Sequence, residues 1–256
     1  MKPWYRPVGH EVTVFASAYK QALPVLLKGP TGSGKSRFVE YMADQSDRPL
    51  IQVACNEDTS ASDLIGRFLI KGGETVWVDG PVTRAVRTGS FLYLDEVAEA
   101  REDVMVVLHS LSDFRRTLFI DKTGESLTAA PGFQMIMSFN PGYQSRLKEM
   151  KPSTRQRFVT IAFDFPKLDI EIEIVSKESG VDSGTAKKLC ALGEQIRKLT
   201  DLPLKETAST RLLVYAAKLI QSGLHPRLAC DSSIVQTITD DPETVTALRD
   251  LVELRF

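Results

Sequence analysis

The sequence is poor in the residues that build disulfide-linked or metal-stapled folds. It contains 3 cysteines and 3 histidines in 256 residues. The cysteines, Cys55, Cys190 and Cys230, are odd in number and widely spaced, which excludes a paired disulfide framework and predicts small, buried, reduced thiols. The histidines do not have the spacing of metal ligands.

A strong charge of one sign and long hydrophobic runs are absent as well. The formal net charge is −1, so no broad electrostatic attraction draws the chain to nucleic acid or to an anionic membrane. No apolar run approaches the ~20 residues that span a bilayer, and residues 1–7 lack the apolar core of a signal peptide. We therefore expect a cytoplasmic protein that binds neither nucleic acid nor membrane.

What is present is an α/β pattern followed by a helical one. Short apolar runs alternate with helical patterns up to about residue 165, which predicts a parallel sheet flanked by helices. The expected strands are 25–27, 50–54, 91–94, 134–139 and 159–163. The later segments expected to be helical are 170–179, 183–199, 210–222 and 226–237. Ser183 and Ser209 are the expected N-caps. The predicted domains are an α/β nucleotide-binding domain of residues 1–166 and a small helical lid domain of residues 167–256.

Two segments do not belong to a minimal α/β scheme. Residues 67–78 place β-prone runs on both sides of Gly72-Gly73, and residues 118–128 do the same around residues 122–125. Both patterns predict β-hairpins. They are either surface decoration or protrusions that contact a partner or a central pore, with Phe68 and residues 122–125 as candidate contacts.

A phosphate-binding loop is the most informative motif. The pattern G-x-x-x-x-G-K-[ST] is formed by Gly29, Pro30, Thr31, Gly32, Ser33, Gly34, Lys35 and Ser36. It lies between an expected strand and an expected helix, the context that such a loop requires. Glycines let backbone N–H groups surround an anion, and the helix N-terminus adds partial positive charge. Lys35 then reaches the β- and γ-phosphates of ATP, and Ser36 offers a hydroxyl to Mg²⁺.

Two acids follow the apolar strand 91–94. The carboxyl ends of strands in α/β folds are where ligands bind, so we expect Asp95 to hold Mg²⁺ and Glu96 to polarise the water that attacks the γ-phosphate. Asn140 ends another expected strand and is a candidate to contact the γ-phosphate or its water. The alternative interpretation of Asn140-Pro141 is a simple turn.

Three arginines complete the candidate site. Arg155 and Arg157 come just before the last expected strand, and an arginine supplied across a subunit interface can accelerate phosphoryl transfer by ~10³–10⁵. We favour Arg157 over Arg155 for this role. Arg211 opens a helix of the second domain and is a candidate to contact bound nucleotide. The alternative for all three is a solvated arginine on a helix.

The order of these motifs resembles that of AAA+ ATPases, and the two hairpins resemble the insertions of the MoxR group. Similarity to the CbbQ/NorQ/GvpN branch of that group covers nearly the whole chain, and the CbbQ group is the nearest. The segments that carry it are 5–9, 27–32, 53–58, 61–67, 93–97, 140–144, 147–158 and 208–211. Members often have threonine where this chain has Ser36, which preserves the hydroxyl.

This resemblance implies a homo-oligomeric, hexameric ring that hydrolyses ATP with Mg²⁺. It further implies a CbbO-like partner with a von Willebrand factor A domain, and Rubisco as the client from which inhibitory sugar phosphates are released. Within the same branch, the alternatives are NorQ-like service to nitric oxide reductase and a GvpN-like role in gas vesicles. From other classes, the alternatives are a nucleotide-switched binding module without hydrolysis and a small-molecule phosphotransferase.

Overall fold

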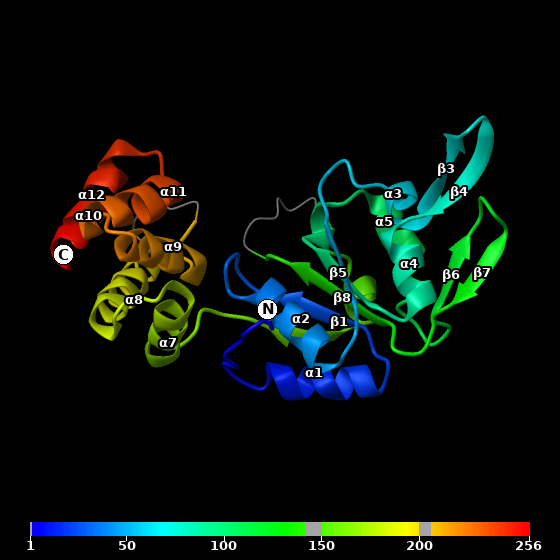
Figure 1. The fold of residues 1–256 in the computed structure, drawn as a ribbon, viewed down its shortest axis with the longest axis horizontal. Helices are drawn as coiled ribbons and strands as arrows, with labels where there is room; N and C mark the ends of the chain where they lie inside the picture. Colours follow the sequence, from blue (N-terminus) through cyan, green and yellow to red (C-terminus); the bar gives the residue numbers. More distant parts are fainter. Residues whose placement is uncertain (1, 142–149, 200–205) are drawn as a thin grey trace. The chain divides into compact units, whose positions relative to one another are not determined.

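The computed structural model describes residues 2–141, 150–199 and 206–256 (Figure 1). The chain divides into two compact units, one of residues 1–30 with 35–163 and one of residues 31–34 with 164–256. The similarity segments 140–144 and 147–158 fall partly outside the described residues, at 142–144 and 147–149. No helix among the described residues is long and apolar enough to cross a membrane.

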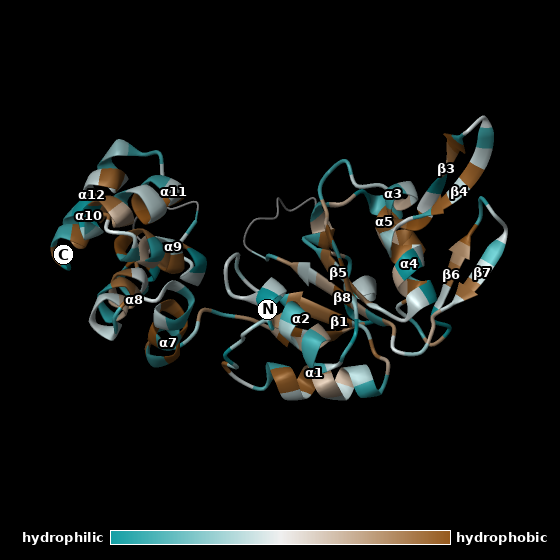
Figure 2. Cartoon of the chain, in the orientation of Figure 1, coloured by the Kyte–Doolittle hydropathy of each residue, from teal (hydrophilic) through white to brown (hydrophobic). Residues whose placement is uncertain are grey.

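The first unit is built on a five-stranded parallel sheet, as the sequence predicts. Its strands are β1 (Val25–Lys28), β2 (Leu50–Ala54), β5 (Phe91–Asp95), β8 (Gln134–Phe139) and β9 (Val159–Ala162). They are ordered β2-β5-β8-β1-β9 and all pair in parallel. The central strands are apolar along most of their length (Figure 2), as expected for strands buried on both faces. The carboxyl ends of β1, β5 and β8 therefore meet at one edge of the sheet.

Helices cover both faces of this sheet. They are α1 (Glu11–Lys20), α2 (Lys35–Gln45), α3 (Ala61–Ile65), α4 (Pro81–Thr88), α5 (Glu102–Leu108) and α6 (Pro152–Arg155), with a 3₁₀ turn at Val97–Glu99. Successive residues of β5 point to opposite faces. Phe91 and Tyr93 pack with Phe15 and Phe38 from α1 and α2, whereas Leu92 and Leu94 pack in a second core with residues of α4 and α5.

Both predicted hairpins are present in the first unit. One consists of β3 (Gly66–Lys71) and β4 (Glu74–Asp79), and the other of β6 (Thr117–Ile120) and β7 (Glu125–Thr128). Gly72 and Gly73 turn the first hairpin with φ of 60° and 87°, a left-handed pair that glycine adopts without strain. The two hairpins extend from the same side of this unit (Figure 1).

Arg87 on α4 joins the base of the β3–β4 hairpin to the turn end of the β6–β7 hairpin. Its Nε donates to Asp79 Oδ2 at 2.8 Å, where β4 ends. Its Nη1 and Nη2 donate to the carboxylate of Glu125, where β7 begins, at 2.7 and 2.5 Å. Asp79 also accepts a 2.7 Å hydrogen bond from Trp77 Nε1. Charged hydrogen bonds thus run from one hairpin through α4 to the other.

The second unit is helical. Its helices are α7 (Leu168–Ser179), α8 (Ser183–Arg197), α9 (Thr210–Gln221), α10 (Pro226–Cys230), the π-helical segment Asp231–Val235, α11 (Gln236–Ile238) and α12 (Pro242–Glu253). Ser209 caps α9 as predicted and accepts from Leu212 N. The prediction of Ser183 as a cap is wrong, because Asp182 caps α8 and accepts from Thr185 N at 3.0 Å. A carboxylate at that place also stabilises the positive end of the helix.

A buried ion pair ties three helices of the second unit together. Glu171 on α7 is 1% exposed and receives Nη1 and Nη2 of Arg197 at 2.9 and 2.7 Å. Thr210 Oγ1, at the start of α9, donates to the same carboxylate at 2.6 Å. Arg197 also donates through Nε to the carbonyl of Ala208 at 2.7 Å and lies over the ring of Phe165. The pair thereby fixes the start of α9.

Candidate functional site

The Gly-rich loop connects β1 to α2. Gly32 and Gly34 have φ of 72° and 92°, a region that side chains disfavour. A Cβ on Gly29 would lie 2.4 Å from the carbonyl oxygen of Phe163, so a larger residue would collide with the neighbouring chain segment. The loop leads into the N-terminus of α2, where free backbone N–H groups and the helix dipole favour an anion.

Lys35 is the first residue of α2, and only 7% of its surface is exposed. Its Nζ donates to the carbonyls of Gly29 and Pro30, each at 2.8 Å, and to Asn140 Oδ1 at 2.7 Å. A buried ammonium needs such oxygen partners to offset its lost hydration. The same ammonium is the group that would meet a phosphate bound by the loop.

Asp95 is held at the end of β5 by three hydroxyl groups. Tyr93 Oη donates to its Oδ1 at 2.7 Å, and Ser138 Oγ donates to the same atom. Ser36 Oγ donates to Oδ2 at 3.3 Å. Burial, followed by the Asp95 charge, raises the pKa of Tyr93, so the phenol keeps its proton and remains a donor.

Ser36 and Asp95 provide the oxygen ligands that Mg²⁺ prefers. Their hydroxyl and carboxylate oxygens lie 3.3 Å apart, close enough to reach one ion. Among the described residues, no group of three or more His, Cys, Asp and Glu side chains could hold a metal by itself. A small donor set of this kind suits an ion that takes its other ligands from nucleotide and water.

Glu96 and Asn140 lie next to each other at the same edge of the sheet. Glu96 has a left-handed backbone with φ of 55°, and its N–H donates to Ser138 Oγ at 3.0 Å. Asn140 Nδ2 donates to Glu96 Oε1 at 3.1 Å. Asn140 thus presents its oxygen to the Lys35 ammonium and its amino group to the Glu96 carboxylate, the orientation in which both contacts are favourable.

Tyr93 and Ser138 are polar residues of the site that the sequence analysis missed. The sequence position of each residue could have indicated its place in the site. Tyr93 precedes Asp95 by two residues and therefore shares its face of the strand, and Ser138 is a polar residue within the fully buried strand β8. Cys55 lies beside the site, where its N–H donates to the Asp95 carbonyl. Burial, Asp95 and Glu96 raise the pKa of its thiol to about 12, which leaves it a poor nucleophile.

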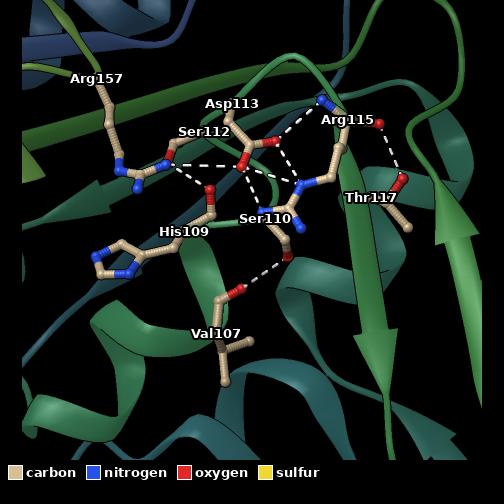
Figure 3. A network of polar contacts seen from close by, with 8 residues as sticks. All are labelled: Val107, His109, Ser110, Ser112, Asp113, Arg115, Thr117 and Arg157. Carbon is tan, nitrogen blue, oxygen red and sulfur yellow. Dashed lines mark hydrogen bonds and ion pairs between the residues drawn. The ribbon is translucent and has the colours of Figure 1, made fainter.

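The two arginines near β9 have different surroundings. Arg155 donates through Nε to the carbonyl of Met150 at 2.9 Å, and its guanidinium lies 5.7 Å from the ring centroid of Phe139. Arg157 has a side chain that is 36% exposed, and its Nη1 lies 3.6 Å from Asp113 Oδ2 (Figure 3). Arg211 is exposed in the first turn of α9, in the second unit.

Comparisons with known proteins identify the family. Residues 24–158 match the family of AAA domains of the dynein-related subfamily, and residues 171–255 match the C-terminal family of CbbQ, NirQ and NorQ. The chain belongs to the CbbQ/NirQ/NorQ family of AAA proteins. The five-stranded sheet, the flanking helices and the Gly-rich loop are the AAA P-loop fold of this family.

Individual relatives align with the CbbQ/NirQ/NorQ chain from end to end. It is 56% identical over 254 residues to protein NorQ of Paracoccus denitrificans, covering 99% of the chain and 94% of the relative. It is 52% identical to denitrification regulatory protein NirQ of Stutzerimonas stutzeri, covering 99% and 92%. It is also 52% identical to protein CbbQ of Hydrogenophilus thermoluteolus, covering 100% and 96%.

A solved structure shares the fold. A point mutant of Thermotoga maritima RuvB superposes with a TM-score of 0.58 at 14% identity, covering 96% of this chain and 71% of that one. At such low identity the likeness concerns the fold alone.

Proposed function

We propose that this protein is an ATP-hydrolysing motor of the MoxR type that remodels a client protein. The observation that carries the proposal is the connected network at the ends of β1, β5 and β8. In it, Asn140 contacts both Lys35 and Glu96, and Ser36 contacts Asp95. A phosphate-binding cation, a metal-binding pair and a carboxylate able to orient water lie together, which is the set that phosphoryl transfer to water requires.

Each part of the network has a role in this proposal. The backbone N–H groups of Gly29 to Gly34 would surround the phosphates of ATP, and Lys35 would contact the β- and γ-phosphates. Ser36 and Asp95 would hold Mg²⁺, which neutralises charge on the phosphates when it is bound. The three hydroxyls that donate to Asp95 would hold that carboxylate in position for the ion.

Glu96 would accept a hydrogen bond from the attacking water, with Asn140 holding Glu96 in place. Arg157 would reach the γ-phosphate of a neighbouring subunit, and Arg155 is the alternative for that role. Arg211 would contact the nucleotide from a lid of residues 167–256, which moves against a nucleotide domain of residues 1–166 as ATP is hydrolysed. Sites shared between subunits require an oligomer, for which we propose a hexameric ring.

The proposal also concerns the identity of the client protein. We propose Rubisco, with release of inhibitory sugar phosphates and with a CbbO-like partner that carries a von Willebrand factor A domain. The chain's 52% identity to CbbQ of Hydrogenophilus thermoluteolus supports this. A second candidate is a client in denitrification, nitric oxide reductase, which the 56% identity to NorQ and the 52% identity to a denitrification regulatory protein favour. Stimulation of hydrolysis by one purified client and not by the other would decide between them.

The decisive experiment measures ATP hydrolysis by the purified chain over a range of protein concentrations. We expect specific activity to rise with concentration and to disappear in Glu96→Gln, which retains ATP binding. Glu102→Gln is the matched control, because Glu102 is an exposed acid at the start of α5. Hydrolysis by Glu96→Gln at the wild-type rate would reject this site. Hydrolysis that is independent of concentration would reject the shared-site mechanism.

A further inference from the structure

Asp113 lies between two guanidinium groups in the turn that follows α5 (Figure 3). Arg115 contacts both carboxylate oxygens, with Nε 3.1 Å from each and Nη2 2.6 Å from Oδ2. Arg157 Nη1 lies 3.6 Å from the same Oδ2. One carboxylate therefore contacts two arginines, one of them the arginine proposed to act on the neighbouring subunit's nucleotide.

We propose that Asp113 is a positioning residue for Arg157, and that Arg115 balances the charge of Asp113 so that the Arg157 guanidinium remains available to a phosphate. The inference rests on the proposed function, which assigns Arg157 to the γ-phosphate of the adjacent protomer. Three features of the turn support it.

The first feature is that the turn itself fixes the carboxylate. Arg116 N–H donates to the Asp113 carbonyl at 3.2 Å, which closes the turn, and Arg115 N–H donates to Asp113 Oδ1 at 3.0 Å. Arg116 anchors the turn to the body of the unit, because its guanidinium donates to the carbonyls of Phe133 and Ala22. The turn thus holds Asp113 in place while its Oδ2 faces Arg157.

The second feature is a parallel attachment between the same two segments. His109 Nε2 lies 3.3 Å from Oγ1 of Thr154, which belongs to α6, three residues before Arg157. Burial, followed by the charges of Arg157 and Lys151, lowers the pKa of His109, so the imidazole is neutral near pH 7 and does not repel Arg157. The end of α5 therefore holds the Arg157 segment at two points.

The third feature is the net charge of the cluster together with the weakness of the ion pair between Asp113 and Arg157. Two arginines and one aspartate leave the cluster with a net charge of +1, which favours an approaching anion. Asp113 stays ionised because the hydrogen bonds and charge of Arg115, and then the charge of Arg157, hold its pKa below the usual range. The Arg157 pair is long and its side chain is 36% exposed, so it is weak. Asp113 can orient Arg157 without preventing its transfer to a phosphate.

The test compares hydrolysis and nucleotide binding in the full chain. Arg157→Ala should lower kcat by ~10³ or more. Asp113→Asn should lower kcat by about 10- to 100-fold, because a displacement of about 1 Å at a catalytic group has effects of this size. The KM and the affinity for ATP should stay within about twofold of the wild-type values, because ATP binding does not depend on an arginine from the neighbouring subunit. Asp113→Glu should recover part of the lost kcat.

A double variant separates positioning from folding. Arg115→Gln leaves Asp113 free to bind Arg157 more strongly and removes the net positive charge, so kcat should fall. Adding Asp113→Asn to Arg115→Gln should raise kcat again, a reversal of sign that lost stability cannot produce. Asp231→Asn is the matched control, because Asp231 has a similar two-point contact with Arg249 in the second unit and should leave kcat unchanged. Thermal unfolding shows that each variant is folded.

The outcomes distinguish the inference from the function on which it rests. Loss of activity in Arg157→Ala with unchanged kcat in Asp113→Asn would overturn the positioning role alone. Unchanged kcat in Arg157→Ala would overturn both the role of Arg157 and this inference. A third outcome is that kcat is lower in Asp113→Asn and lower still in the double variant. Asp113 would then have only a structural role, and the inference would be overturned.

Discussion

Lys35 Nζ donates a 2.7 Å hydrogen bond to Asn140 Oδ1, across 105 residues of sequence. The contact joins the Gly-rich loop to the end of β8, the central strand of the sheet. The amide of Asn140 also donates to Glu96. One side chain therefore contacts both the Lys35 ammonium and the Glu96 carboxylate. A phosphate that competes for Lys35 would therefore alter the environment of Glu96.

Asn140→Asp tests this bridge. The substitution replaces an amide donor 3.1 Å from Glu96 with a second carboxylate, which repels Glu96 and binds Lys35 more strongly. We expect kcat for ATP hydrolysis to fall by about 100-fold, the effect of losing a positioned donor, with weaker ATP binding. Steady-state kinetics and ATP titration measure both. Wild-type turnover would remove Asn140 from the mechanism.

Arg155 and Arg157 should differ in their effect on stability. Arg155→Ala removes a hydrogen bond to Met150 and a contact with the Phe139 ring, so the free energy of unfolding should fall by about 1–2 kcal/mol. Arg157→Ala removes a long, exposed ion pair and should change it by less than about 0.5 kcal/mol. Urea unfolding measures both values. The opposite order would indicate that Arg157 is the structural arginine.

Glu171→Ala should destabilise the second unit strongly. It leaves the Arg197 guanidinium buried without its carboxylate, which costs about 3–5 kcal/mol in other proteins. Glu194→Ala is the matched control, because Glu194 forms an exposed ion pair with Lys198 that solvent screens, so its loss should change the free energy of unfolding far less. Denaturant unfolding of the full chain compares the two. Equal effects would contradict the importance of the buried pair.

The thiols should resist alkylation in the folded chain. Burial raises the pKa of each of Cys55, Cys190 and Cys230 to about 12 from a usual value of 9.0. The thiolate fraction at pH 8 is therefore much smaller in the folded than in the unfolded state. By the same linkage, the folded state should lose stability as the pH rises from 9 toward 12, because the unfolded chain releases these protons first.

Mass spectrometry after brief treatment with iodoacetamide at about pH 8 checks this. We expect little labelling of the native chain and full labelling in urea. Rapid labelling of any one cysteine in the native chain would show that its pKa is not raised.

Most of the sheet and much of the site could be predicted from local sequence. The strands are apolar runs bounded by turn residues, and the Gly-rich loop has a fixed spacing, so both are visible without tertiary information. The three hydroxyls around Asp95 could not be assigned in this way. They depend on β5 pairing with β8, which brings Ser138 next to Asp95, and strand order is a tertiary property.

Helix boundaries in the second unit were harder to predict. Asp182 and Ser183 are both good N-cap residues, and the backbone of the folded chain decides between them. The pattern of residues 226–237 predicts one helix, but Asp231–Val235 is π-helical, a local insertion that periodicity does not reveal. Helix α12 was missed although Asp241 and Pro242 form a clear start signal for it.

Arg87 couples the two hairpins mechanically, because it contacts a residue of each. A load that pulls β7 away from α4 must first break the charged hydrogen bonds to Glu125, and until it does, the strain passes through Arg87 to Asp79 and the base of β4. These contacts are partly exposed, so solvent screens them and they weaken as salt is added. The hairpins would thus respond together to a gentle force, and separately to a large one or at high ionic strength.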